Sequence, residues 1–195
     1  MKNLSDHIYD LVENSIDADA SLIKVSMEIG EDFFLRCTVE DNGKGISEEN
    51  LKRVTHPFYT KRTTRSQGLG LALIEQNSAA TGGAISIESE LKRGTILRFT
   101  WNLKHIDCLP CGDLSEIFIS LMRACQNVEF EFLLRLSTER VIWSSKEINE
   151  SIYPLSLCNS EIRDGVKEFL ESTSIAFYRK WNKNILSNIN SEIKF

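Results

Sequence analysis

The chain has 195 residues, of which 42% are hydrophobic and 26% charged, the proportions of an ordinary globular protein. No apolar run approaches the ~18 residues that a membrane-spanning helix needs, and the first residues lack the apolar stretch of a signal peptide. A formal net charge of −5 argues against a nucleic-acid-binding face, which is usually basic. We therefore expect a cytoplasmic protein that has neither a membrane nor a nucleic acid as partner.

The cysteines do not have the pattern of a disulfide-stabilised domain, because five is an odd number and no secretory signal precedes them. Cys108 and Cys111 have the C-x-x-C spacing of half a zinc site or of a redox pair. No second close pair of cysteine or histidine accompanies them. We expect reduced thiols, and the alternative is a metal or thiol-redox module at Cys108 and Cys111.

The first predicted element is an amphipathic helix over residues 5–19. Ser5 or Asp6 is a suitable N-cap, because either side chain accepts a hydrogen bond from an orphan backbone N–H group. Apolar residues recur at helical spacing on one face, and polar residues lie on the other, at positions i, i+4 and i+7. The apolar face holds Ile8, Leu11, Val12 and Ile16, and the polar face holds Asp10, Asn14 and Asp17.

Alternating and helical patterns continue to about residue 103, interrupted by glycine-containing turns. Residues 56–67 are polar and basic without periodicity, so they are predicted to form a mobile loop. The other elements are predicted strands over 22–29 and 33–41, a short helix over 48–55, a helix over 69–80, and strands over 84–90 and 95–103.

A connector over residues 105–112 divides the chain into a domain over 1–104 and a small C-terminal extension over 113–195. The extension reads as helix, strand, strand, helix. The predicted elements are a helix over 113–125, strands over 128–136 and 139–144, and a helix over 160–182. We expect this α+β extension to cover an edge of the main sheet.

Three strings in the first half carry a family resemblance through their order and spacing: Asp-Leu-Val-Glu-Asn at 10–14, Glu-Asp-Asn-Gly-Lys-Gly at 40–45, and Gly-Leu-Gly-Leu-Ala-Leu at 68–73. Residues 4–103 resemble the ATP-binding domain shared by histidine kinases, gyrase, mismatch-repair ATPases and heat-shock chaperone ATPases. The resemblance covers about half of the chain. It implies an α+β fold of the Bergerat type, a two-layer sandwich with a mixed, mostly antiparallel sheet.

The resemblance also implies how Mg²⁺ and the adenine of ATP are held. Asn14 corresponds to the asparagine that ligates Mg²⁺, which is consistent with the preference of this ion for hard oxygen ligands. Asp41 corresponds to the carboxylate that accepts a hydrogen bond from the adenine amino group. Gly43 and Gly45 let the backbone approach the base, and Thr95 helps to hold adenine. Asn42-Gly43 is also a strong hairpin-turn signal by itself.

The phosphates are expected at the start of the helix over 69–80, at Gly68, Leu69 and Gly70, where backbone N–H groups and the helix dipole attract anions. A Rossmann turn is excluded, because a basic loop precedes Gly68 and Leu73 occupies the third glycine position. Lys61 and Arg65 of the loop supply positive charge to the triphosphate in this interpretation. The alternative is that both belong to a solvated charged loop.

Asp10 is the candidate catalytic residue. In the gyrase and mismatch-repair branch a glutamate four residues before the asparagine is the general base, and Asp10 is one methylene shorter. None of the three histidines is a suitable phosphoacceptor, and His7 is expected to be a surface or capping residue. The chain is therefore expected to hydrolyse ATP or to transfer its γ-phosphate in trans to an unknown protein. The alternative is a non-catalytic, ATP-dependent interaction switch.

Overall fold

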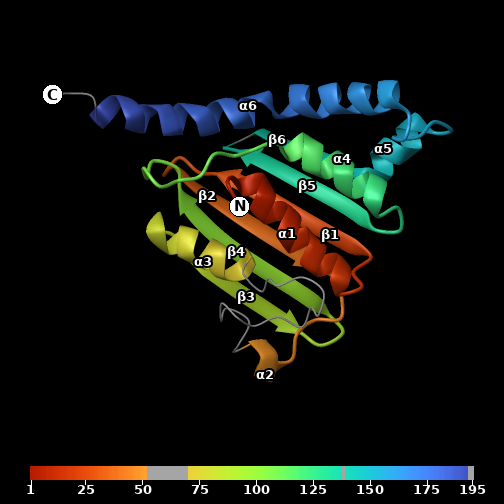
Figure 1. Cartoon of the computed structure of the whole chain (residues 1–195), viewed down its shortest axis with the longest axis horizontal. Coiled ribbons are helices and arrows are strands. Elements are labelled where there is room, and N and C mark those ends of the chain that lie inside the picture. Colours follow the sequence, from red (N-terminus) through yellow and green to blue (C-terminus); the bar gives the residue numbers. More distant parts are fainter. Residues whose placement is uncertain (52–69, 138, 193–195) are drawn as a thin grey trace.

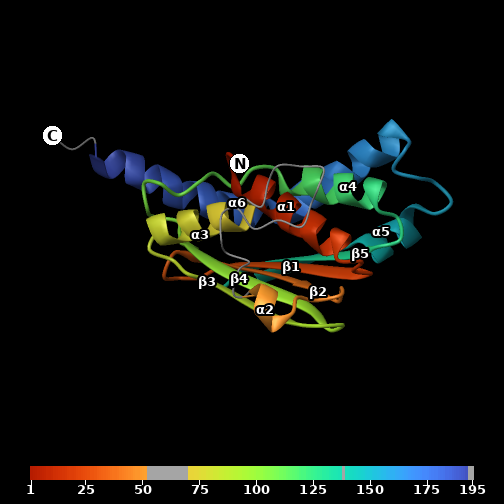
Figure 2. The same cartoon turned by 60° about the horizontal axis from the view of Figure 1, so that its bottom comes forward.

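This computed structural model describes residues 1–51, 70–137 and 139–192, with side chains up to residue 183. The described chain forms one six-stranded sheet with helices packed against one of its faces (Figure 1 and Figure 2). The helices are α1 (Leu4–Asp17), α2 (Glu48–Leu51), α3 (Gly70–Ala80), α4 (Leu114–Ala124), α5 (Ser145–Ile152) and α6 (Ser160–Glu192). The strands are β1 (Leu22–Ile29), β2 (Phe34–Asp41), β3 (Ile85–Glu90), β4 (Gly94–Asn102), β5 (Glu129–Leu136) and β6 (Glu139–Ser144).

The sheet has the order β3-β4-β2-β1-β5-β6. All neighbouring strands are antiparallel except β1 and β5, which pair in parallel from Leu22–Glu129 to Ile29–Leu136. The α+β fold with a mixed, mostly antiparallel sheet is therefore confirmed. The strands that follow the connector do not form a sheet of their own, because β5 and β6 extend the sheet beyond β1.

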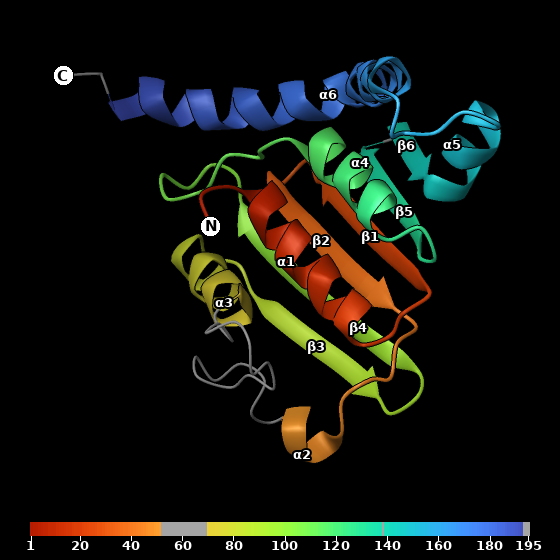
Figure 3. The ribbon, with the colours of Figure 1, turned by 45° about the vertical axis from the view of Figure 1, so that its right-hand side comes forward.

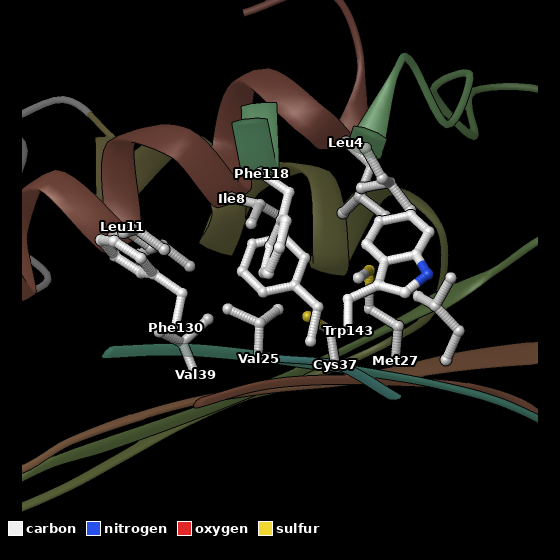
Figure 4. Packing of buried hydrophobic residues seen from close by; sticks show 14 of the residues in the cluster. Leu4, Ile8, Leu11, Val25, Met27, Cys37, Val39, Phe118, Phe130 and Trp143 are labelled. Atoms are coloured by element: carbon white, nitrogen blue, oxygen red, sulfur yellow. The ribbon is translucent and has the colours of Figure 1, made fainter. Parts of the chain in front are cut away.

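Alternation along the strands separates the two faces of the sheet. In β1, Ile23, Val25 and Met27 are buried beneath the helices, whereas Lys24 is exposed on the opposite face and pairs with Glu131 at 3.5 Å. Figure 4 shows side chains of α1 and α4 above the side chains of the strands. Period-two alternation in a half-buried strand produces this arrangement, and it fixes which side chains of each strand can contribute to a site beside the helices.

Helix α1 crosses the middle of the sheet and begins earlier than the sequence predicts. Its N-cap is Asn3, whose Oδ1 accepts from the backbone N–H of Asp6 at 2.8 Å, so the prediction of Ser5 or Asp6 as the cap is wrong. The N–H groups of Leu4 and Ser5 donate to the carbonyls of Pro110 and Cys111, at 2.9 Å each. The connector therefore satisfies donors that a helix N-terminus otherwise leaves without partners.

The C-terminal part packs on the same side of the sheet as α1. The long helix α6 lies against α4 and β5, and its buried residues are Leu170, Ser174, Phe177 and Trp181. The Tyr178 hydroxyl accepts from the backbone N–H of Leu114 at 2.8 Å, at the beginning of α4. Among the described residues, no helix combines the length and the apolar character that crossing a bilayer would require.

Candidate functional site

The polar face of α1 turns away from the sheet, because its apolar face is buried against the strands. Asn14 is exposed and Asp10 is half-buried, one helical turn apart, whereas Leu11 and Val12 between them are buried. Figure 3 shows α1 and α3 side by side over the sheet, and the two helices are in contact. Asp17, also predicted on the polar face, is exposed near the end of α1.

Asp41, the last residue of β2, is held at the end of the strand by two hydrogen bonds. Ser15 Oγ donates to its Oδ2, and the backbone N–H of Gly43 donates to its Oδ1, both at 2.9 Å. The residue is only 9% exposed. Ser15, the residue that follows Asn14 in α1, is itself buried and connects Asp41 to this helix. Sequence analysis missed Ser15, although its position next to Asn14 on a predicted helix was a signal.

The turn after Asp41 requires glycine because backbone from other segments lies against it. A Cβ atom at Gly43 would lie 2.6 Å from the carbonyl oxygen of Ala18, and one at Gly45 would lie 2.0 Å from that of Glu90. Gly45 also has φ +66°, which favours glycine. The two glycines therefore allow the turn to approach the end of α1 and the β3–β4 turn of this same chain.

Thr95 lies next to Asp41, because the two residues are paired across β2 and β4. Ser89 organises this corner: its Oγ donates to the carbonyl of Gly94 and accepts from the backbone N–H of Ile46, at 2.9 and 2.8 Å. The Thr95 hydroxyl lies 2.9 Å from Ser89 Oγ. Since the single proton of Ser89 is used on Gly94, Thr95 is the donor in that contact, and its own oxygen remains an acceptor beside Asp41. Sequence analysis missed Ser89.

The first turn of α3 lies against Asp10. A Cβ atom at Gly70 would lie 1.8 Å from Asp10 Oδ2, so any larger residue there would displace the carboxylate from its present position. A negative group beside a helix N-terminus is stabilised by the helix dipole, typically by about 0.3–1 kcal/mol. The structure thus brings the candidate catalytic residue and the last glycine of the second glycine string together. The other predicted phosphate-binding residues, Lys61, Arg65, Gly68 and Leu69, lie outside the described residues, as does the predicted loop.

The prediction for His7 is wrong: the side chain is 0% exposed, between α1, α3 and β4. Its Nε2 lies 3.0 Å from Asn77 Nδ2 of α3, and burial lowers its pKa to about 4. The helical pattern misplaces His7 because histidine is polar, yet the residue lies on the same face of α1 as Leu4, Ile8 and Leu11. These three residues are buried in the core.

Cys108 and Cys111 are buried to different degrees in the connector. Burial raises the pKa of the Cys108 thiol to about 12 and also raises the pKa of Cys111. Such thiols stay protonated at neutral pH and are poor nucleophiles. The described residues include no group of three or more histidine, cysteine or acidic side chains arranged to hold a metal ion. A metal or redox module at these cysteines thus gains no support.

Comparison with known proteins agrees with this fold. Residues 2–105 match the family described as histidine kinase-, DNA gyrase B- and HSP90-like ATPase. Because this match covers more than half of the chain, the chain belongs to that family. Membership identifies residues 2–105 as an ATP-binding domain of the histidine-kinase-like type.

Sensor kinases are among the similar proteins. The chain is 37% identical over 91 residues to a probable C4-dicarboxylate sensor kinase of Halalkalibacterium halodurans. This alignment covers 44% of this chain and 17% of that protein. It is 33% identical over 105 residues to sporulation kinase D of Bacillus subtilis, in an alignment that covers 51% of this chain and 21% of that protein. The chain therefore spans about a fifth of the length of these relatives.

A solved structure extends the likeness of fold beyond the family match. The N-terminal domain of a DNA repair protein is similar with a TM-score of 0.52 at 15% identity, covering 74% of this chain and 53% of that chain. Since residues 2–105 are little more than half of the chain, this match includes residues that follow the connector. The similarity is one of fold.

Proposed function

We propose that this chain binds Mg·ATP between α1, the Asp41 turn and the start of α3, and that it hydrolyses ATP or transfers its γ-phosphate to a partner protein in trans. The observation that carries the proposal is the Asp41 carboxylate. It is buried between Ser15 of α1 and the N–H of Gly43, and it lies beside Thr95. Family membership supports the ATP-binding part of the proposal.

In this proposal Asp41 selects adenine. Each of its oxygens accepts one hydrogen bond within the protein and retains a further lone pair, so the carboxylate can accept from the exocyclic amino group of adenine. Guanine presents a carbonyl oxygen at the same position, which would leave two acceptors facing each other in a buried place. The oxygen of Thr95 is a second acceptor for the base or for a bridging water.

The residues of α1 suit a magnesium ion that is bound mainly by phosphate and water. Asn14 offers an exposed amide oxygen, a hard ligand of the kind that Mg²⁺ prefers. The ion would neutralise charge on the triphosphate. In this proposal the phosphates are also bound by Gly68, Leu69 and Gly70. Lys61 and Arg65 supply positive charge to them. Their roles follow from the resemblance of their sequence strings to the family.

Asp10 is the proposed base that orients the attacking water or accepts its proton. The carboxylate is one turn of helix before Asn14 and thus near the metal-binding end of the pocket. It also lies against Gly70, where the dipole of α3 stabilises its charge. To act as a base, this carboxylate must remain within hydrogen-bond reach of the water.

Replacing Asp41 by asparagine tests the adenine assignment. We expect Asp41→Asn to weaken ATP binding at least about tenfold, ~1.4 kcal/mol, because the new amide group turns a donor or a weaker acceptor toward the amino group of adenine. Preference for ATP over GTP should fall as well. Titration calorimetry with both nucleotides and Mg²⁺ measures both effects.

The neighbouring variant Glu40→Gln is the matched control, because it removes the same charge from an exposed side chain of β2. It should bind ATP as the wild type does. Unchanged ATP binding by Asp41→Asn would contradict the role of Asp41. A wild-type chain that binds no ATP in the presence of Mg²⁺ would refute the whole proposal.

One observation favours a second candidate function, a non-catalytic switch in which bound ATP changes a protein-binding surface. The Asp10 side chain, which is one methylene shorter than a glutamate, ends against Gly70. Incubation with γ-labelled ATP, alone and in host lysate, separates the two functions. The catalytic proposal expects free phosphate or a labelled polypeptide, and less of either with Asp10→Asn. Intact bound ATP in the wild type would instead establish the switch.

A further inference from the structure

Helices α1 and α3 are joined at two places, and only one of them belongs to the proposed site. The first is the contact of Asp10 with Gly70. The second lies deeper in the protein, where Nε2 of the fully buried His7 is 3.0 Å from Nδ2 of Asn77. His7 precedes Asp10 by about one helical turn, and Asn77 follows Gly70 by about two turns. The two contacts thus lie along the same helix pair.

The hydrogen bond fixes the chemical state of His7. The amide NH₂ group of Asn77 only donates, so Nε2 is the acceptor and the imidazole is neutral, with its proton on Nδ1. Burial lowers the pKa of His7 to about 4, which agrees with a neutral ring at physiological pH. Nδ1 has no hydrogen-bond partner within the part of the chain that the structure describes. The ring is therefore held by one directional bond and by packing.

Trp101 connects the same pair of helices to the sheet. Its ring is edge-on to His7, with centroids 5.6 Å apart and an interplanar angle of 85°. Its Nε1 donates to Ser78 Oγ at 3.1 Å, so consecutive residues of α3, Asn77 and Ser78, are both bound to this cluster. Trp101 and Ser78 are buried. Two directional bonds on adjacent residues fix the rotation of α3 as well as its position along its axis.

From these contacts we propose that His7 is a positioning residue, which sets the place of the α3 N-terminus relative to the polar face of α1. A helix is stiff over two turns, so a shift at Asn77 is carried to Gly70 and to the phosphate end of the pocket. The adenine end, formed by Asp41, Ser15 and Thr95, does not include α3. The inference rests on the proposed function and assigns to His7 an effect on phosphate binding alone.

The test compares a full nucleotide with one that lacks phosphates. His7→Leu keeps a side chain of similar size but removes the acceptor of the hydrogen bond from Asn77. In this variant we expect the Kd for ATP with Mg²⁺ to rise about tenfold and the Kd for adenosine to stay unchanged. Calorimetry for ATP and an NMR titration for adenosine measure the two constants. His7→Gln, which retains an acceptor for Asn77, should restore most of the ATP affinity.

Two further variants separate positioning from stability. Phe118→Leu removes packing against Phe132 and Trp143, remote from α3, and should lower stability without changing the ratio of the two affinities. Asn77→Ala removes the donor of the same hydrogen bond at a residue that is only half-buried. It should raise the Kd for ATP and leave the Kd for adenosine unchanged, so the test does not depend on the folding of His7→Leu.

Equal losses of ATP and adenosine affinity in Asn77→Ala, or no loss of either, would overturn the inference while leaving the proposed function intact. A wild-type chain that binds adenosine as tightly as ATP would also overturn it, because no phosphate contribution would then exist. Binding of neither ligand by the wild type would refute the inference together with the proposed function.

Discussion

At the scale of single residues, buried and half-buried polar side chains link the elements that form the site. Ser15 and Ser89 make the hydrogen bonds that orient Asp41 and Thr95, and His7 connects α1 with α3. Buried donors and acceptors of this kind are costly to leave unpaired, typically by about 1–3 kcal/mol each. The geometry of the pocket therefore depends on residues that would not touch the nucleotide.

The residues with family counterparts are predictable from the sequence, whereas the residues that support them are not. Asp41, Gly43 and Thr95 lie in strings whose spacing is informative. Ser89 lies six positions before Thr95 across the β3–β4 turn, but its contact with the backbone N–H of Ile46 joins segments 43 positions apart. A hydrogen bond between distant segments depends on the register of the sheet, which a single sequence does not reveal.

The buried imidazole of His7 predicts a pH dependence of stability. Its pKa is about 4 in the folded chain and ordinarily 6.5, so the unfolded chain binds the proton more strongly. The contribution to stability is complete above pH 6.5 and is lost as the pH falls toward 4. At about 1.4 kcal/mol for each unit of pKa difference, the loss amounts to at most about 3.5 kcal/mol.

Urea denaturation at pH 7 and pH 4.5 measures this effect by comparing the wild type with His7→Gln, which cannot titrate. We expect the free energy of unfolding to fall further in the wild type, because other carboxyl groups titrate equally in both chains. Equal losses in the two chains would contradict the burial of a neutral His7.

At the scale of elements, the periodic patterns predicted the strands and long helices well, and helix ends less well. The start of α1 was misplaced because Asn3, Ser5 and Asp6 are all suitable caps. Tertiary contacts decide between them: the carbonyls of Pro110 and Cys111 accept from the first N–H groups and allow the helix to begin at Leu4. The sequence of the connector does not reveal that it folds back onto this helix.

Helix α5 was missed altogether, although a local signal was available. Ser144 caps this helix, with Oγ accepting from the backbone N–H of Glu147 at 3.3 Å. Serine followed three residues later by glutamate is the pattern of a capping box. The helix has only 8 residues, and its apolar positions are too few to stand out against the strand that precedes it.

At the scale of the whole molecule, the parallel pairing of β1 with β5 joins the ATP-binding domain to the C-terminal extension. The division into residues 1–104 and 113–195 remains a prediction from sequence. In the structure, β1 has β2 on one side and β5 on the other, and Phe130 and Phe132 of β5 are buried in the core that β1 shares. We therefore expect the two parts to depend on each other for stability.

A chain truncated after Gly112 tests this dependence. Removal of β5 would leave the backbone of β1 without partners along one side and would expose apolar residues of the core, a combination that promotes aggregation. We expect the truncated chain to unfold at a lower temperature than the full chain or to be insoluble, as measured by calorimetry and light scattering. A soluble fragment with the stability of the full chain would establish an autonomous domain.

The same parallel pairing has a consequence for the order of events at the ribosome. Leu22 is paired with Glu129, so the first strand of the sheet emerges long before its parallel neighbour has been translated. Contacts between such distant segments slow folding, and nascent strands without neighbours are prone to mispairing. During translation, β1 lacks its parallel neighbour β5 until the last third of the polypeptide has been synthesised. A chaperone that shields β1 would have its greatest effect in that interval.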